Sequence, residues 1–130
     1  MKNPFYLIIE DLAKANEQLQ RAIHEPESDI VRDATIQRFE FTFELFWKTL
    51  KKILAYEGDP STSPRETLKK AYQNKIIDDE VTFLQMLEDR NKTTHIYNQE
   101  MAQKIYTNIK DNAPKIDVAI KNLSNKYGAK

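Results

Sequence analysis

The feature that most constrains the fold is a stretch without glycine or proline, which runs from Ser28 to Glu57. Large apolar residues recur along it at the spacing of an α-helix, namely Phe39, Phe43, Phe46, Leu50, Ile53 and Leu54. A local alternation of apolar and polar residues between Phe39 and Leu45 is typical of a strand, but the longer helical pattern outweighs it. The sequence therefore predicts one long helix that begins after Ser28 and is ended by Gly58 to Pro60.

This predicted helix carries a second apolar face, on which Phe41 and Leu45 lie. A helix that is apolar on two faces sits at the centre of a bundle or at a contact between subunits, because only these places bury both faces. The centre of a bundle is the more common situation, and a dimer contact is the alternative.

The first and last segments show the same helical spacing. The first is expected to run from about Phe5 to Ile23 and the last from Asn98 toward Tyr127. Proline lacks the N–H that a helix interior uses, so Pro114 must kink the last helix or start a new one. The expected buried residues are Ile8, Leu12, Ala15, Leu19, Ala22 and Ile23 in the first segment, and Met101, Ile105, Ile109, Ala113, Ile116, Ile120 and Leu123 in the last.

Two shorter helices are predicted between the long ones. Ser63 is an N-cap, Pro64 fits the first helical position and Glu66 completes a capping box. Asp78 is the predicted cap of the next helix, which explains the acidic cluster at residues 78–80 better than a metal site does. The expected buried residues are Leu68, Ala71 and Tyr72 in the first of these helices, and Val81, Phe83, Leu84 and Leu87 in the second.

The fold class follows, because no segment is a convincing strand. The sequence predicts an all-α protein, an up-and-down bundle of about five helices that forms a single domain over residues 1–130. Two glycines and five prolines are too few for a turn-rich β-sandwich of 130 residues. No apolar run is long enough to cross a membrane and the N-terminal residues do not resemble a signal peptide, so a soluble, cytoplasmic protein is expected.

Composition also excludes several kinds of site. The absence of cysteine rules out disulfides, thiolate metal sites and a cysteine nucleophile. The two glycines are isolated, so no glycine-rich phosphate loop exists, and neither histidine has a second histidine at helical metal-site spacing. We therefore expect no metal and no cofactor. The 20 basic and 20 acidic residues argue against a strongly basic nucleic-acid binder but permit a local basic site.

One polar segment, residues 88–98 with the sequence EDRNKTTHIYN, stands apart at a predicted helix junction. Arg90 supplies a planar charged group that matches phosphate oxygens, and histidine, the residue type at position 95, is the side chain whose ordinary pKa in model peptides, about 6.5, suits proton transfer near neutral pH. Together they suit metal-independent cleavage of RNA, with His95 moving protons and Arg90 stabilising charge on the phosphate. Spacing alone favours a structural role, in which such residues bond to carbonyls or to Glu88 and Asp89.

Residues Arg90 to His95 resemble the R-x4-H motif of the HEPN superfamily, and Tyr97 extends the motif to R-x4-H-x-Y. The likeness is wider than the motif. The segments RFEFTFELFWKTLKKILAYEG, SPRETLKKAYQNKIIDD and MLEDRNKTTHIYNQEMAQKIYTNI resemble the family of nucleotidyltransferase substrate-binding proteins. This resemblance is strong from about Phe39 to Ile109 and weak toward both ends.

The resemblance implies a bundle that forms a homodimer, with the motif facing a cleft near the dimer axis. It also implies a separate minimal nucleotidyltransferase as partner, in a module like a toxin–antitoxin pair. Arg90 would bind phosphate, His95 would transfer protons and Asn91 would be a polar helper. The partner would transfer AMP to Tyr97, and the added charge and bulk would silence the ribonuclease.

Two functions stay open at this point. The first is a metal-independent endoribonuclease, which the intact set of Arg90, His95 and Tyr97 favours. The second is a non-catalytic subunit that docks to the nucleotidyltransferase or presents its substrate. Neutral net charge favours the second, because an enzyme that grips long RNA usually carries a basic stripe.

Overall fold

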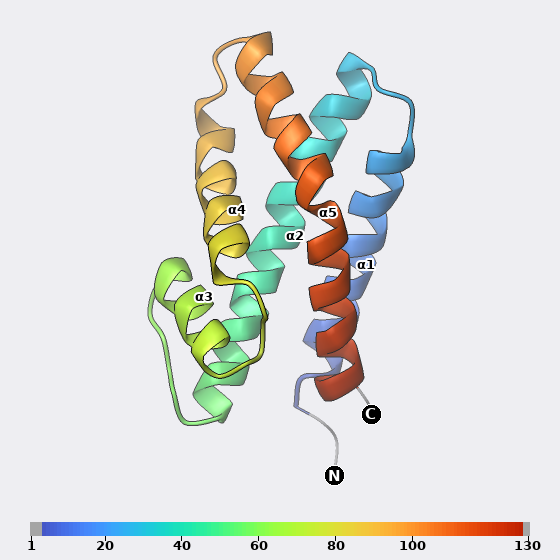
Figure 1. Ribbon diagram of the computed structural model, residues 1–130. Coiled ribbons are helices and arrows are strands. Elements are labelled where there is room, and N and C mark those ends of the chain that lie inside the picture. Colours follow the sequence, from blue (N-terminus) through green and yellow to red (C-terminus); the bar gives the residue numbers. More distant parts are fainter. Residues whose placement is uncertain (1–3, 129–130) are drawn as a thin grey trace.

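The computed structural model describes residues 4–128, and these form a bundle of five α-helices (Figure 1). The elements are α1 (Tyr6–His24), α2 (Asp29–Tyr56), α3 (Pro64–Gln73), α4 (Glu80–Lys92), the short 3-10 helix η1 (Thr93–His95) and α5 (Gln99–Tyr127). No residue in this described range lies in a strand, so the all-α prediction is confirmed. Helices α1, α2 and α5 extend along the bundle, whereas α3 and α4 together cover one side (Figure 1).

Helix α2 organises the bundle, because it packs against each of the other four α-helices. Its N-terminus is fixed as predicted, since the Ser28 hydroxyl accepts a hydrogen bond from the Val31 N–H at 3.0 Å. The predicted apolar face is fully buried, with at most 1% exposure for each of Phe39, Phe43, Phe46, Leu50, Ile53 and Leu54. Each such side chain contributes about 1.5–3 kcal/mol through removal of apolar surface from water.

The second apolar face of α2 is not covered by the rest of the chain. Phe41 is 62% exposed, and Leu45 is half-buried. Both line a shallow groove of about 590 Å³ between α1 and α2. A position at the centre of the bundle therefore explains only the first face of this helix.

The faces predicted for the flanking helices are correct at most positions, but Ile23, Leu84 and Met101, which were expected in the core, are only half-buried. In α1 the buried residue is Ile9, and Ile8 is half-buried. Tyr72 and Val81 were expected in the core but are 44% and 79% exposed. In α4 the buried residues are Phe83, Met86, Leu87 and Asp89.

The start of α4 also differs from the prediction. Its N-cap is Asp79 and not Asp78, because the Asp79 carboxylate accepts a hydrogen bond from the Thr82 N–H at 2.9 Å. The same carboxylate also forms an ion pair with Lys115 of α5. This tertiary contact favours Asp79 over its neighbour as the cap, a choice that capping preference alone could not make.

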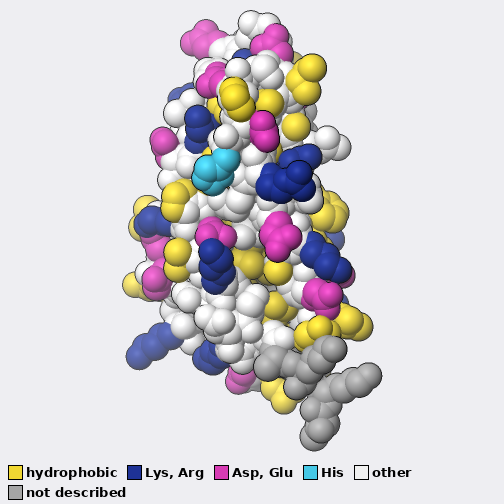
Figure 2. Space-filling view, turned by 90° about the vertical axis from the view of Figure 1, so that its right-hand side faces the viewer, with side chains coloured by type: hydrophobic (Ala, Val, Ile, Leu, Met, Phe, Trp, Pro, Cys, Tyr) yellow, Lys and Arg dark blue, Asp and Glu magenta, His cyan; other side chains and the backbone are white. Residues whose placement is uncertain are grey.

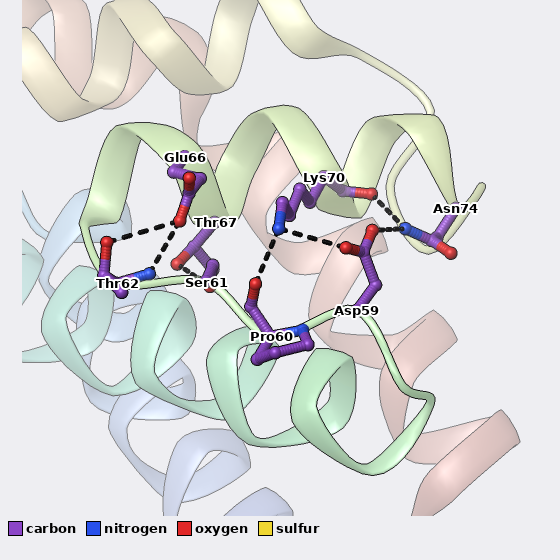
Figure 3. Close-up of polar contacts among 8 residues, drawn as sticks. All are labelled: Asp59, Pro60, Ser61, Thr62, Glu66, Thr67, Lys70 and Asn74. Carbon is purple, nitrogen blue, oxygen red and sulfur yellow. Dashed lines mark hydrogen bonds and ion pairs between the residues drawn. The ribbon is translucent and has the colours of Figure 1, made fainter.

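The connection between α2 and α3 is held by polar contacts (Figure 3). Gly58 has a φ of +87°, a conformation that favours glycine and lets the chain leave α2 sharply. Lys70 donates a hydrogen bond to the Pro60 carbonyl at 2.6 Å and forms an ion pair with Asp59 at 3.0 Å. Asn74 donates to the other oxygen of Asp59 at 3.0 Å. The loop is therefore fixed to the side of α3.

The start of α3 follows the predicted pattern with one change. The Ser63 hydroxyl accepts a hydrogen bond from the Glu66 N–H at 3.1 Å, and Pro64 occupies the first turn. The Glu66 carboxylate, however, accepts from the N–H of Thr62 at 2.8 Å, one residue before the expected partner Ser63. The cap is thus shared over two residues of the incoming loop.

Helix α5 continues through Pro114, so the proline does not end the helix. Figure 1 shows that the axis of α5 changes direction near its middle, as a proline in a helix interior requires. At this point Gln20 of α1 donates a hydrogen bond to the Ala113 carbonyl at 3.1 Å. Within the part of the chain that is described, no helix has the length and apolar character needed to span a membrane.

Candidate functional site

The polar segment at residues 88–98 is not a simple loop. Arg90 and Asn91 belong to the last turn of α4, which continues to Lys92, and His95 lies in η1. Helix α4 therefore continues through the first part of the predicted junction. The Thr93 hydroxyl donates a hydrogen bond to the Arg90 carbonyl at 2.7 Å and helps to continue the helical path. The arginine is thus attached to a rigid helix, while the histidine lies just beyond the end of that helix.

The Arg90 side chain is bound to α2. Its Nη2 lies 2.6 Å from Oε2 of Glu44, and its Nη1 donates to Oδ1 of Asn91 at 3.4 Å. The acidic neighbours that sequence spacing offered as partners have other contacts. Glu88 forms an exposed ion pair with Arg65 at 3.8 Å, and Asp89 is buried against α5.

Glu44 is itself held by several groups. Its Oε2 also accepts a hydrogen bond from Nε1 of Trp47 at 3.1 Å, and its Oε1 lies 3.5 Å from Nζ of Lys48. Burial raises the pKa of Glu44, but the hydrogen bond from Trp47 and the charges of Arg90 and Lys48 outweigh it, so the net pKa is lowered. Glu44 is therefore an ionised carboxylate at neutral pH.

Sequence reasoning did not identify Glu44 as part of the site. A signal was available, because Glu44 precedes Trp47 by three positions and Lys48 by four, and residues at these spacings share one helix face. A tryptophan N–H in a partly buried position needs an acceptor, which a carboxylate on the same face can supply. The contact with Arg90, however, joins residues 46 positions apart.

His95 and Tyr97 form the exposed part of the site. The Tyr97 hydroxyl lies 3.4 Å from Nδ1 of His95, and the two ring centres are 6.4 Å apart. Tyr97 is 79% exposed, and His95 is exposed as well. Both side chains are therefore accessible to a large substrate or to another enzyme. Of the predicted site residues, the structure thus shows contact within two pairs, Arg90 with Asn91 and His95 with Tyr97.

Two lysines of α2 lie on the same side as Glu44 and Trp47. Lys48 lies beside Glu44, and Nζ of Lys51 lies 6.0 Å from the centre of the Trp47 ring. On the side of the bundle where α1 lies, side chains of both charges are mixed (Figure 2). Among residues 4–128, no group of three or more histidine or acidic side chains is arranged to hold a metal ion.

A helical bundle that presents an R-x4-H-x-Y segment at the end of one helix is the arrangement of a HEPN protein. Residues 7–125 match the family described as nucleotidyltransferase substrate binding protein like. Because the match covers nearly the whole sequence, the chain belongs to this HepT-like family.

Two known proteins illustrate the relationship. The probable ribonuclease HepT of Haemophilus influenzae is 30% identical over 88 residues, which are 64% of this chain and 60% of that protein. A crystal structure of a protein from Thermus thermophilus superposes with a TM-score of 0.77 at 30% identity, covering 91% of this chain and 99% of the other. The expected family and fold are thereby confirmed.

Proposed function

We propose that this protein is a metal-independent endoribonuclease of the toxin type, which works with a separate minimal nucleotidyltransferase. The observation that carries the proposal is the arrangement of the motif on α4 and η1. The Arg90 guanidinium is fixed on a rigid helix, and an exposed histidine and tyrosine follow directly. The resemblance to a protein named as a probable ribonuclease supports the same assignment.

The proposed reaction needs only groups that the chain and the RNA supply. His95 accepts the proton of the ribose 2′-hydroxyl, whose oxygen attacks the adjacent phosphorus. The bond from phosphorus to the 5′-oxygen then breaks, which leaves a 2′,3′-cyclic phosphate, and the 5′-oxygen takes up the proton that His95 had accepted. Arg90 stabilises the charge that grows on the phosphate oxygens, and Asn91 acts as a polar helper by accepting a hydrogen bond from Arg90.

The proposed regulation uses Tyr97. The partner nucleotidyltransferase would join the tyrosine oxygen to the α-phosphorus of ATP, with pyrophosphate as the leaving group. The exposed hydroxyl of Tyr97 is accessible for this reaction. Because that hydroxyl lies 3.4 Å from Nδ1 of His95, the new phosphate would place negative charge and bulk beside the proposed proton acceptor. RNA would then be repelled from the site.

A homodimer is part of the proposal. The uncovered face of α2, with Phe41 largely exposed and Leu45 half-buried, supports a second copy of the chain as the covering partner. Two copies would also bring two Arg90 and two Lys92 side chains into one assembly, which raises the local positive charge that RNA binding needs.

A second function, that of a non-catalytic subunit that docks to the nucleotidyltransferase, is favoured by one observation. Glu44 partly neutralises Arg90, and the chain as a whole has no net charge. A subunit that only binds a protein partner needs no surplus of positive charge.

The test is a comparison of RNA cleavage by the wild type with Arg90→Ala, His95→Ala and the control His24→Ala. His24 is also exposed, but it lies at the end of α1 and contacts the Gln20 carbonyl at 2.7 Å. Each site variant is expected to lose about 100-fold or more in rate, and the control is expected to retain full activity. Cleavage that survives both site changes would contradict these roles. An inactive wild type that still binds the nucleotidyltransferase would support the docking function.

A further inference from the structure

The contact between Glu44 and Arg90 joins the central helix to the proposed catalytic segment. At 2.6 Å it is short even for a hydrogen bond between charged groups, which are typically about 2.7–2.9 Å long. We infer that Glu44 is a positioning residue for the reaction, which fixes the orientation of the Arg90 guanidinium from α2. This inference rests on the ribonuclease function proposed above.

The first argument concerns the freedom of the arginine. The Arg90 side chain is 36% exposed and stands in the last turn of α4, where a long side chain has many accessible rotamers. Asn91 provides a second contact at 3.4 Å, which is too long to fix the guanidinium alone. The ion pair to Glu44 is the strong contact, so the direction of the guanidinium depends on it.

The second argument is that Glu44 is itself fixed in place. Trp47 donates to the same carboxylate oxygen that Arg90 binds, at 3.1 Å, and Trp47 is partly buried against the core. Lys48 lies at 3.5 Å from the other oxygen. The contacts therefore form a chain from the core through Trp47 and Glu44 to Arg90, and each link limits the movement of the next.

The third argument concerns the donors that stay available. A guanidinium has five N–H groups in a planar fork. Glu44 takes one from Nη2 and Asn91 takes one from Nη1, which leaves three for phosphate oxygens. Glu44 thus fixes the guanidinium of Arg90 but leaves most of its N–H donors available for phosphate oxygens.

This role predicts opposite effects on binding and on the chemical step. A carboxylate beside a phosphate site repels the phosphate, so removal of its charge should leave RNA binding unchanged or tighter. Loss of a fixed guanidinium should slow the reaction, because a donor that is misplaced by about 1 Å can cost about 100-fold in rate. A contact that only holds α2 to α4 would not lower kcat while leaving RNA binding unchanged or tighter.

The experiment compares the wild type with Glu44→Gln and Glu44→Ala, using single-stranded RNA for cleavage and a 2′-O-methylated copy for binding without cleavage. Glu40→Gln is the matched control, since Glu40 lies one turn earlier on α2 and the change removes the same charge. Trp47→Phe is the second test, because it removes the N–H that holds Glu44 but keeps an aromatic ring.

We expect kcat to fall about 10- to 100-fold in Glu44→Ala and less in Glu44→Gln, which retains one acceptor oxygen. Trp47→Phe should also lower kcat, and Glu40→Gln should have the kcat of the wild type. The dissociation constant for the methylated RNA should stay equal or decrease in both Glu44 variants.

Two results would overturn the inference. The first is wild-type kcat in Glu44→Ala, and the second is a fall in kcat accompanied by weaker binding of the methylated RNA, which would indicate a merely structural contact. If the wild type cleaves no RNA at all, the proposed function itself fails and the inference falls with it. That outcome is recognised from the wild type alone and is therefore distinct from a failure of the Glu44 variants.

Discussion

Asp89 of α4 and Asn108 of α5 form a polar contact at the buried interface of their helices, one residue before Arg90. The Asp89 side chain is 2% exposed, and its Oδ1 accepts a hydrogen bond from Nδ2 of Asn108 at 3.3 Å. Desolvation by burial raises the pKa of Asp89, and the hydrogen bond from Asn108 and the charge of Lys92 only partly offset it. The contact therefore holds the end of α4 against α5, although burial disfavours the charged form of the Asp89 carboxyl.

We predict that Asp89 makes the protein less stable as the pH rises. Its carboxyl binds a proton more tightly in the folded state, so folded chains carry more protons above the ordinary pKa of 3.8. Stability then falls as the pH rises from about 4 through the raised pKa. Urea unfolding at several pH values should show that Asp89→Asn removes this fall. The exposed Asp111→Asn should retain it, and an unchanged slope in Asp89→Asn would contradict the assignment.

Asp79 is predicted to act in the opposite direction. Hydrogen bonds from Lys115 and from the Thr82 N–H lower its pKa to about 2. A lowered pKa means that Asp79 contributes stability above about pH 4, and this contribution is lost as the pH falls through about 2. Asparagine is also a good N-cap, so Asp79→Asn should remove the ion pair but preserve the cap. We expect it to be less stable than the wild type at pH 7, with the difference vanishing near pH 2. Asp78→Asn, one residue earlier, should show no difference at either pH.

Two phenylalanines of α2 should respond differently to the same change. The Phe46 ring is 1% exposed and stacks on Phe83 with ring centres 5.2 Å apart. Phe46→Ala should therefore cost about 3–5 kcal/mol of unfolding free energy, measured in urea. Phe41 is 62% exposed, so Phe41→Ala should change the stability of the monomer by less than about 0.5 kcal/mol.

The same Phe41 tests the proposed dimer. Phe41→Glu places a charge on the uncovered face of α2, and sedimentation should detect a shift from dimer to monomer. A dimer that persists in this variant would mean that the subunits meet at another surface.

Modification of Tyr97 can be tested by mass spectrometry after co-expression with the nucleotidyltransferase. We expect one added AMP group in the wild type and none in Tyr97→Phe, because the adduct needs the tyrosine oxygen. Tyr72→Phe is the matched control, since Tyr72 is also exposed but lies in α3. An adduct on another residue would contradict the proposed regulation.

Local signals in the sequence predicted much of the fold. The periodicity of α2 identified its buried residues, and Ser28 and Ser63 identified the starts of two helices. Such signals depend on residues within one or two turns of each other, so they are visible without a tertiary structure. For the same reason the preference for Asp78 as a cap was wrong, because the choice of Asp79 involves Lys115, which lies 36 positions away.

The sequence by itself determined that the chain is an all-α bundle and which residues form its R-x4-H-x-Y segment. Only the tertiary structure decided that Arg90 is bound by Glu44 and that Asp89 is buried beside Asn108. These contacts depend on how α4 packs against α2 and α5. Packing of this kind leaves no periodic pattern in the sequence, because it brings together residues from helices that are far apart along the chain.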